Sequence, residues 1–217
     1  MHSADTTMEL ARPTRASAYL DWAQMLSGAV LILFMWAHMI LVASVIISPK
    51  VMNAIAWFFE ATYMAQIGGP VIALIFLFHF VLAARKTPFR AREQKAFWRH
   101  SRQMKHADTW LWLVQVVTAM IILIMGITHM WVVLTDLPIT AAKSAARIQN
   151  GWWLAFYLVL LPMVELHVSV GFYRIGVKWG FIRRDNRPKM KKVEKYLIIT
   201  FIAIGLLALL RFSFLAV

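Results

Sequence analysis

Five long apolar segments run along the chain, and two of the four segments between them are rich in Lys and Arg. The apolar segments comprise residues 23–48, 61–84, 109–135, 148–173 and 196–217. The first three contain no Asp, Glu, Lys or Arg, the fourth contains only Glu165, and the fifth contains only Arg211. Each is longer than the roughly 20 residues with which a helix crosses a bilayer.

This pattern predicts an all-α integral membrane protein with five transmembrane helices. The apolar residues do not alternate with a period of two, as the strands of a membrane barrel would require. We expect one membrane domain spanning residues 1–217. Its helices are expected at about 22–48, 66–86, 108–135, 148–176 and 194–215.

Composition supports the membrane assignment and excludes several kinds of cofactor site. Hydrophobic residues make up 61% of the chain and charged residues 15%, against about 45–50% and 25% in soluble domains. The chain contains no cysteine. It therefore cannot hold an iron–sulfur cluster, a thiolate zinc site or a covalently attached c-type haem.

The 23 basic residues are distributed unevenly along the chain. Those on one side of the membrane, before the first span and in 85–105 and 174–195, number 19, and those on the other side number four. The positive-inside rule therefore predicts a cytoplasmic N-terminus and a periplasmic C-terminus. Orienting charge explains the basic loops, and a docking surface for cytoplasmic partners is compatible with the same residues.

One histidine lies in each of the first four spans: His38, His79, His129 and His167. With a rise of about 1.5 Å per residue, His79 and His167 lie about 10 Å from the basic edge of the membrane. His129 lies about 10 Å and His38 about 16 Å from the opposite edge. The four therefore form an inner and an outer pair.

Ionisable groups in hydrocarbon are costly, and four such histidines favour a functional role. Two imidazoles that face each other across a bundle are typical of a six-coordinate haem iron. The two pairs predict two haems b at different depths.

Two carboxylates lie in unusual places. Glu165 is within the fourth span, where an ionisable group indicates a proton carrier or a buried hydrogen-bond partner. Glu60 lies among aromatic residues at the outer edge. On the residues alone, an interfacial aromatic belt with one solvated carboxylate is slightly favoured over a quinone pocket. The residues alone leave both interpretations open.

Haem carboxylates would need donors near the membrane edges. Residues placed to supply them are Gln24, Trp112 and Lys178 at the inner edge, and Arg147 and Tyr157 at the outer edge. Trp and Lys at such edges also serve as anchors.

Three stretches resemble the dihaem cytochrome b subunit of bacterial quinol:fumarate reductases, within the succinate:quinone oxidoreductase superfamily. They are LDWAQMLSGAVLILFMWAHM, HADTWLWLVQ and VELHVSVGFYRIGVKWG. With the five spans and four histidines, the resemblance covers about residues 19–210. Met25 departs from the family pattern, which has a small hydroxyl residue there.

The resemblance implies a role for each candidate residue. The proximal haem is expected on His79 and His167, and the distal haem on His38 and His129. Glu60 matches a menaquinol-site carboxylate, and Glu165 matches a glutamate of a transmembrane proton route. The inner haem-carboxylate partners would be Gln24, Trp112 and Lys178, and the outer ones Arg147 and Tyr157.

The implied function is anaerobic respiration at the bacterial inner membrane. Electrons from menaquinol would pass through two haems b to cytoplasmic iron–sulfur and flavoprotein subunits, which hold the clusters and FAD and reduce fumarate to succinate. Such heterotrimers could pair as dimers. The nearer alternative is a dihaem anchor of a succinate:menaquinone reductase that works in reverse. A remote alternative is a haem-free transporter, although the spans show no inverted repeat.

Overall fold

A computed structural model of the chain describes residues 14–87, 90–104 and 107–216. Over these residues every regular element is helical, and five helices are long and apolar enough to cross a membrane. The prediction of an all-α protein with five spans is confirmed. The spans are α1 (Arg15–Ile47), α3 (Gly69–Ala84) with the preceding π-helical turn η1 (Met64–Gly68), α5 (Ala107–Leu134), α7 (Gly151–Lys178) and α8 (Arg187–Ser213).

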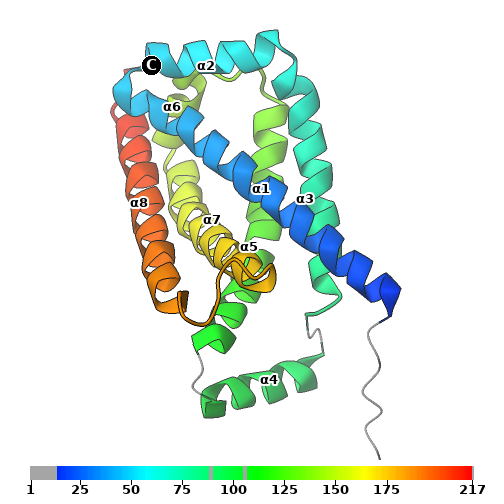
Figure 1. Ribbon diagram of the computed structural model, residues 1–217. Coiled ribbons are helices and arrows are strands. Elements are labelled where there is room, and N and C mark those ends of the chain that lie inside the picture. Colours follow the sequence, from blue (N-terminus) through cyan, green and yellow to red (C-terminus); the bar gives the residue numbers. More distant parts are fainter. Residues whose placement is uncertain (1–13, 88–89, 105–106, 217) are drawn as a thin grey trace, which may run out of the picture.

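Three shorter helices lie across the ends of the bundle (Figure 1). Helices α2 (Pro49–Ala61) and α6 (Ala141–Gln149) cover one end, here called the α2 end. Helix α4 (Ala91–Met104) lies across the other, the α4 end. The span pattern did not predict these helices, because short amphipathic helices lack the length that identifies a span. Helix α1 begins at the α4 end and α8 finishes at the α2 end (Figure 1).

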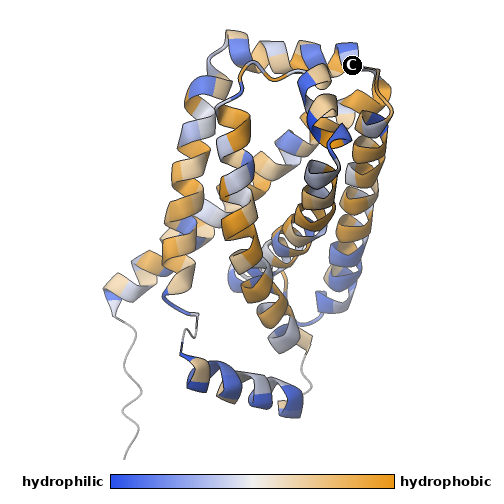
Figure 2. Cartoon of the chain, turned by 180° about the vertical axis from the view of Figure 1, so that it is seen from behind, coloured by the Kyte–Doolittle hydropathy of each residue, from blue (hydrophilic) through white to orange (hydrophobic). Residues whose placement is uncertain are grey.

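Several spans extend beyond their apolar segments. Helix α1 begins at Arg15, well before the expected residue 22, because the Thr14 hydroxyl accepts a hydrogen bond from the Ser17 amide at 3.2 Å and caps the helix. Helix α8 begins at Arg187 rather than 194, with a proline in its first turn. Polar residues therefore extend the beginnings of these two helices beyond their apolar segments, as far back as a capping residue or a loop. Figure 2 shows orange along the spans and blue concentrated in α4.

The spans surround a hollow rather than a solid core. Helix α5 packs against α7, α7 against α8, and α1 against both α3 and α8. Over the described residues, α3 buries one side chain, Leu82, and α5 buries one, Thr118. These two helices present one face to the outside and another to the space inside the bundle.

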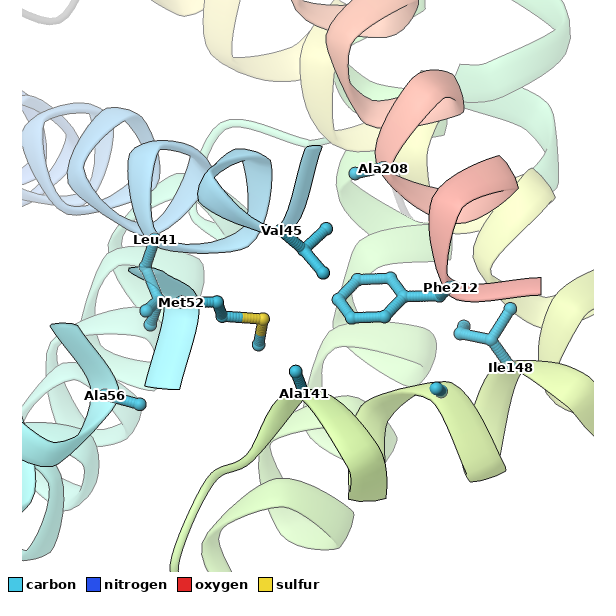
Figure 3. Packing of buried hydrophobic residues seen from close by; sticks show 9 residues of the cluster. Leu41, Val45, Met52, Ala56, Ala141, Ile148, Ala208 and Phe212 are labelled. Atoms are coloured by element: carbon cyan, nitrogen blue, oxygen red, sulfur yellow. The ribbon is translucent and has the colours of Figure 1, made fainter. Parts of the chain in front are cut away.

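A hydrophobic cluster at the α2 end attaches the short helices to the spans (Figure 3). Its members come from α1, α2, α6 and α8: Leu41, Val45, Met52, Ala56, Ala141, Ala145, Ile148, Ala208 and Phe212. Ser48 joins α1 to α2 and caps α2 by accepting a hydrogen bond from the Val51 amide at 3.1 Å. The cluster keeps the loops around the outer part of the hollow in place.

Replacement of Phe212 by Ala should destabilise the protein by about 3–5 kcal/mol, because it opens a cavity in this cluster. Phe212 is 3% exposed, whereas Phe214, two residues later, is 78% exposed. Thermal unfolding of the purified protein would measure the effect, with Phe214→Ala as the matched control. Equal melting temperatures for the two variants would contradict the assigned core.

Candidate functional site

A cavity of about 1210 Å³ runs through the bundle, which is larger than the roughly 300–1,000 Å³ of a typical small-molecule pocket. Its walls come mainly from α1, α3, α5 and α7. All four predicted histidines line it, so residues that are far apart in the sequence face one common space.

Towards the α2 end, His38 of α1 and His129 of α5 face each other. Their ring centroids are 5.9 Å apart and the ring planes are inclined by 63°. The Tyr157 hydroxyl lies 3.0 Å from Nδ1 of His129, and Phe34 stacks on His38. This ring separation is close to what two imidazoles sharing one metal ion require, because metal–nitrogen bonds are about 2 Å long.

Towards the α4 end, the ring of His79 is held against α1. Its Nδ1 atom lies 3.1 Å from the backbone oxygen of Gln24 and 3.0 Å from the Ser27 hydroxyl. Since a carbonyl oxygen only accepts, Nδ1 carries the proton and Nε2 keeps its lone pair. Gly28 makes the close approach possible, because a Cβ atom there would lie 2.9 Å from Cε1 of His79.

His167 of α7 is held in the same way against α5. Its Nδ1 atom lies 3.1 Å from the backbone oxygen of Gln115 and 3.1 Å from the Thr118 hydroxyl. The Thr118 hydroxyl donates to the Val114 carbonyl at 2.7 Å, so it can accept from the imidazole. Both inner histidines therefore have the tautomer whose Nε2 can bind a metal.

Glu165 is buried in α7, with 3% of its surface exposed, and lines the cavity. Within the described part of the chain, its Oε2 atom has no hydrogen-bond partner. Its neighbour His167, two residues along the helix, lines the same cavity. The cavity is therefore wide enough for side chains on two different faces of α7 to line it.

Glu60 lies outside the residues that line the cavity and is half-buried on α2. Its Oε1 atom accepts a hydrogen bond from the Ile139 amide at 3.0 Å, and Oε2 accepts one from the Gln66 side chain at 3.1 Å. Gln66 belongs to the turn η1, which follows Tyr63 in the left-handed region at φ 58°. The carboxylate thus joins α2, η1 and the α5–α6 connection next to the cavity wall.

The five residues expected near haem carboxylates all line the cavity: Gln24, Trp112, Arg147, Tyr157 and Lys178. Two of them already have carboxylate partners. Arg147 donates to Asp136 at 2.8 Å, and Lys178 donates to Asp21 at 3.3 Å. The hydrogen bond from Lys143 lowers the pKa of the Asp136 carboxyl, which keeps it ionised beside Arg147.

Asp21 has further partners and was missed by the sequence reasoning. It also binds Arg85 at 3.1 Å and Lys86 at 2.6 Å, so one carboxylate connects the α4 ends of α1, α3 and α7. The excess of basic residues at this edge was visible in the sequence, but which cations share an acid depends on how the helix ends meet. Ser27, Gly28 and Thr118 were also missed, since small residues in apolar spans usually serve helix packing.

Known proteins share sequence similarity with most of this chain. Residues 91–208 match the family described as succinate dehydrogenase/fumarate reductase transmembrane subunit. The chain is 38% identical over 200 residues to the fumarate reductase cytochrome b subunit of Helicobacter pylori, covering 87% of this chain and 78% of that protein. It is 34% identical over 209 residues to that of Wolinella succinogenes, covering 90% and 82%.

The chain belongs to this family of transmembrane subunits. The expected resemblance is confirmed. As a member, the chain is a multi-pass protein of the bacterial inner membrane and a subunit of an oxidoreductase complex.

The residues of this family member fit a haem group. Within the described ranges, no three His, Cys, Asp or Glu side chains gather as they would around zinc or another protein-ligated metal. Pairs of histidines instead suit an iron whose other ligands come from a porphyrin. The two inner histidines, with Nδ1 bound to a backbone carbonyl, offer Nε2 to such an iron.

Replacement of Asp21 by Asn should leave three unneutralised cations at the α4 end and lower stability by about 1 kcal/mol. Added salt should stabilise the variant by screening the remaining repulsion, and it should weaken the native ion pairs of the wild type. Asp185→Asn, at an exposed site at the same end, is the control. Unfolding measured across a salt series would reveal the difference, and parallel salt responses would argue against the network.

Proposed function

We propose that this subunit oxidises menaquinol and passes electrons through two haems b to iron–sulfur and flavoprotein subunits, which reduce fumarate to succinate. The observation that carries the proposal is the placement of four intramembrane histidines on one cavity, in two groups towards opposite ends. When bound, haem b supplies one-electron transfer by alternation between its ferric and ferrous states.

In this proposal the protein's part is to hold and orient the two groups. His38 and His129 would bind one haem, and His79 and His167 the other. The carbonyls of Gln24 and Gln115 fix the inner imidazoles in the required tautomer and rotation, as supporting hydrogen bonds do at other metal sites. The Tyr157 hydroxyl, 3.0 Å from Nδ1 of His129, helps to hold the rotation of that ring.

The α4 end is proposed to face the cytoplasm and the partner subunits. The basic segments 85–105 and 174–195 flank or include α4 and the start of α8, so the positive-inside rule assigns this end to the cytoplasm. Helix α4 carries exposed Arg92, Arg99 and Arg102, which suit a partner with an acidic face. The electrons leave the membrane at this end.

Menaquinol is proposed to bind at the α2 end beside Glu60. Trp57 and Phe58 of α2 and the nearby Tyr63 are exposed by 71%, 52% and 66%, and such rings suit a quinone ring and its isoprenoid tail. The half-buried Glu60 carboxylate is the proposed acceptor of a proton from the quinol hydroxyl, because each of its oxygens keeps a second lone pair beside the hydrogen bond from Gln66 or Ile139. Glu165, halfway along the cavity wall, would carry protons towards the α4 end.

The direction of the reaction rests on the relatives, which are named as fumarate reductase subunits. The family description also covers succinate dehydrogenases, and the same arrangement of histidines would serve the reverse reaction. Pairing of two heterotrimers is a further part of the proposal.

The purified complex should contain two low-spin haems b per copy of this chain. Substitution of His79 or His167 by Leu should remove the inner haem and retain the outer one, because only the inner iron would lose one of its two proposed histidine ligands. A pyridine haemochrome assay with a dithionite-reduced spectrum measures the number of haems. His100→Leu, at an exposed site on α4, should retain both. A wild-type complex without haem would disprove electron transfer and favour a transporter.

Glu60→Gln and Glu165→Gln should each retain both haems and slow menaquinol-linked fumarate reduction, the former by about 100-fold or more, as expected for loss of a general base. Fumarate reduction driven by a soluble dye that reduces the partner subunits directly should be unchanged. Glu93→Gln, on the exposed face of α4, is the control. Normal quinol-linked turnover in either variant would remove that residue from the proposed mechanism.

A further inference from the structure

The cationic groups at the α4 end of the cavity differ in whether they have an acid partner. Lys178 is bound to Asp21, which also holds Arg85 and Lys86. The Lys178 side chain is 48% exposed, so it lies at the mouth of the cavity rather than within it. Its ammonium therefore has a direct carboxylate partner, which it shares with two other cations.

Arg174, one helical turn before Lys178, is placed differently. It is half-buried and lines the cavity. It follows His167 by seven residues, which brings both side chains to the same face of α7 about 10 Å apart along the axis. In the part of the chain that the structure describes, no hydrogen bond or ion pair involves its guanidinium.

The acid that acts electrostatically on Arg174 is already paired with other cations. Asp108 of α5 binds Lys191 at 2.9 Å and Arg187 at 3.6 Å, both from α8. A guanidinium has five N–H donors, and its burial away from an acceptor is costly. Arg174 therefore faces the cavity as a cation that the protein does not neutralise through direct contact.

Tyr173, the residue next to Arg174, is placed differently. It is 2% exposed, and the Lys191 ammonium of α8 lies 5.7 Å from the centroid of its ring. Its side chain therefore belongs to the contact between α7 and α8. Arg174 is the cation of this turn that faces the cavity without a direct acid partner among the described residues.

We propose that Arg174 binds a carboxylate of the haem that His79 and His167 would hold, and that it is the principal cation of that carboxylate. This inference rests on the proposed function. A guanidinium can bind a carboxylate through two parallel hydrogen bonds, whereas the ammonium of Lys178 acts as a single point charge. Lys178 keeps a secondary role, because Asp21 shares its charge.

A redox titration of the intact complex tests this assignment. Arg174→Gln should lower the midpoint potential of the inner haem, because loss of a nearby cation favours the more positive, oxidised iron. A tenfold change in the ratio of oxidised to reduced haem is expected, which corresponds to about 59 mV for a one-electron couple. The inner haem is identified as the one that is lost in His79→Leu.

Three further variants make the result specific. Arg174→Lys should assemble and show a smaller shift, since it keeps the charge and loses the paired donors. Lys178→Gln should shift the potential less than Arg174→Gln does. Arg184→Gln, an exposed cation at the same end, should leave the potential unchanged. If Arg174→Gln does not assemble, Arg174→Lys decides, and a wild-type potential in that variant overturns the proposal.

The outcomes separate this inference from the proposed function. Fewer than two haems in the wild-type complex would refute the proposed function itself. Two haems whose potentials do not respond to Arg174→Gln, or respond more strongly to Lys178→Gln, would overturn only the role of Arg174.

Discussion

The rest of the structure depends on how imidazoles are accommodated inside a membrane. A histidine ring has one donor and one acceptor nitrogen in its neutral form, and hydrocarbon satisfies neither. The structure supplies a backbone carbonyl for Nδ1 of His79 and another for Nδ1 of His167. Both histidines line the same cavity, although they come from different helices. The hollow bundle thus brings together imidazoles whose second nitrogen is not used by the backbone.

A hollow bundle needs stabilisation at its ends, because α3 and α5 each bury a single side chain over the described residues. At the α2 end, an apolar cluster of α1, α2, α6 and α8 provides it. At the α4 end, Asp21 connects three helices through Arg85, Lys86 and Lys178. The α2 end thus combines hydrophobic packing with the ion pairs of Asp136, and ion pairs of Asp21 join the helices at the α4 end.

The charged residues that line the cavity differ in whether an oppositely charged side chain contacts them. Arg147 is paired with Asp136 near His38 and His129, and Lys178 is paired with Asp21 at the α4 end. Arg174 and Glu165 line the cavity without such direct partners in the described chain. Charges that the protein leaves uncompensated inside a membrane are costly. These two residues are therefore the ones that we propose as the points at which a bound group and a proton would be held.

The sequence by itself determined the class of the protein and the number of its spans, because the length of an apolar segment is set by the thickness of hydrocarbon. It also singled out the four histidines and Glu165, since ionisable residues within such segments are rare. The positions of the helix ends were less accurate, because Thr14 and the first turn of α8 continue helices into polar sequence. The pairing of Asp21, the close approach at Gly28 and the isolation of Arg174 were decided by the tertiary structure alone. Each depends on which helices are neighbours and on how far they are shifted along their axes. The pattern of apolar and polar residues in the sequence does not specify either.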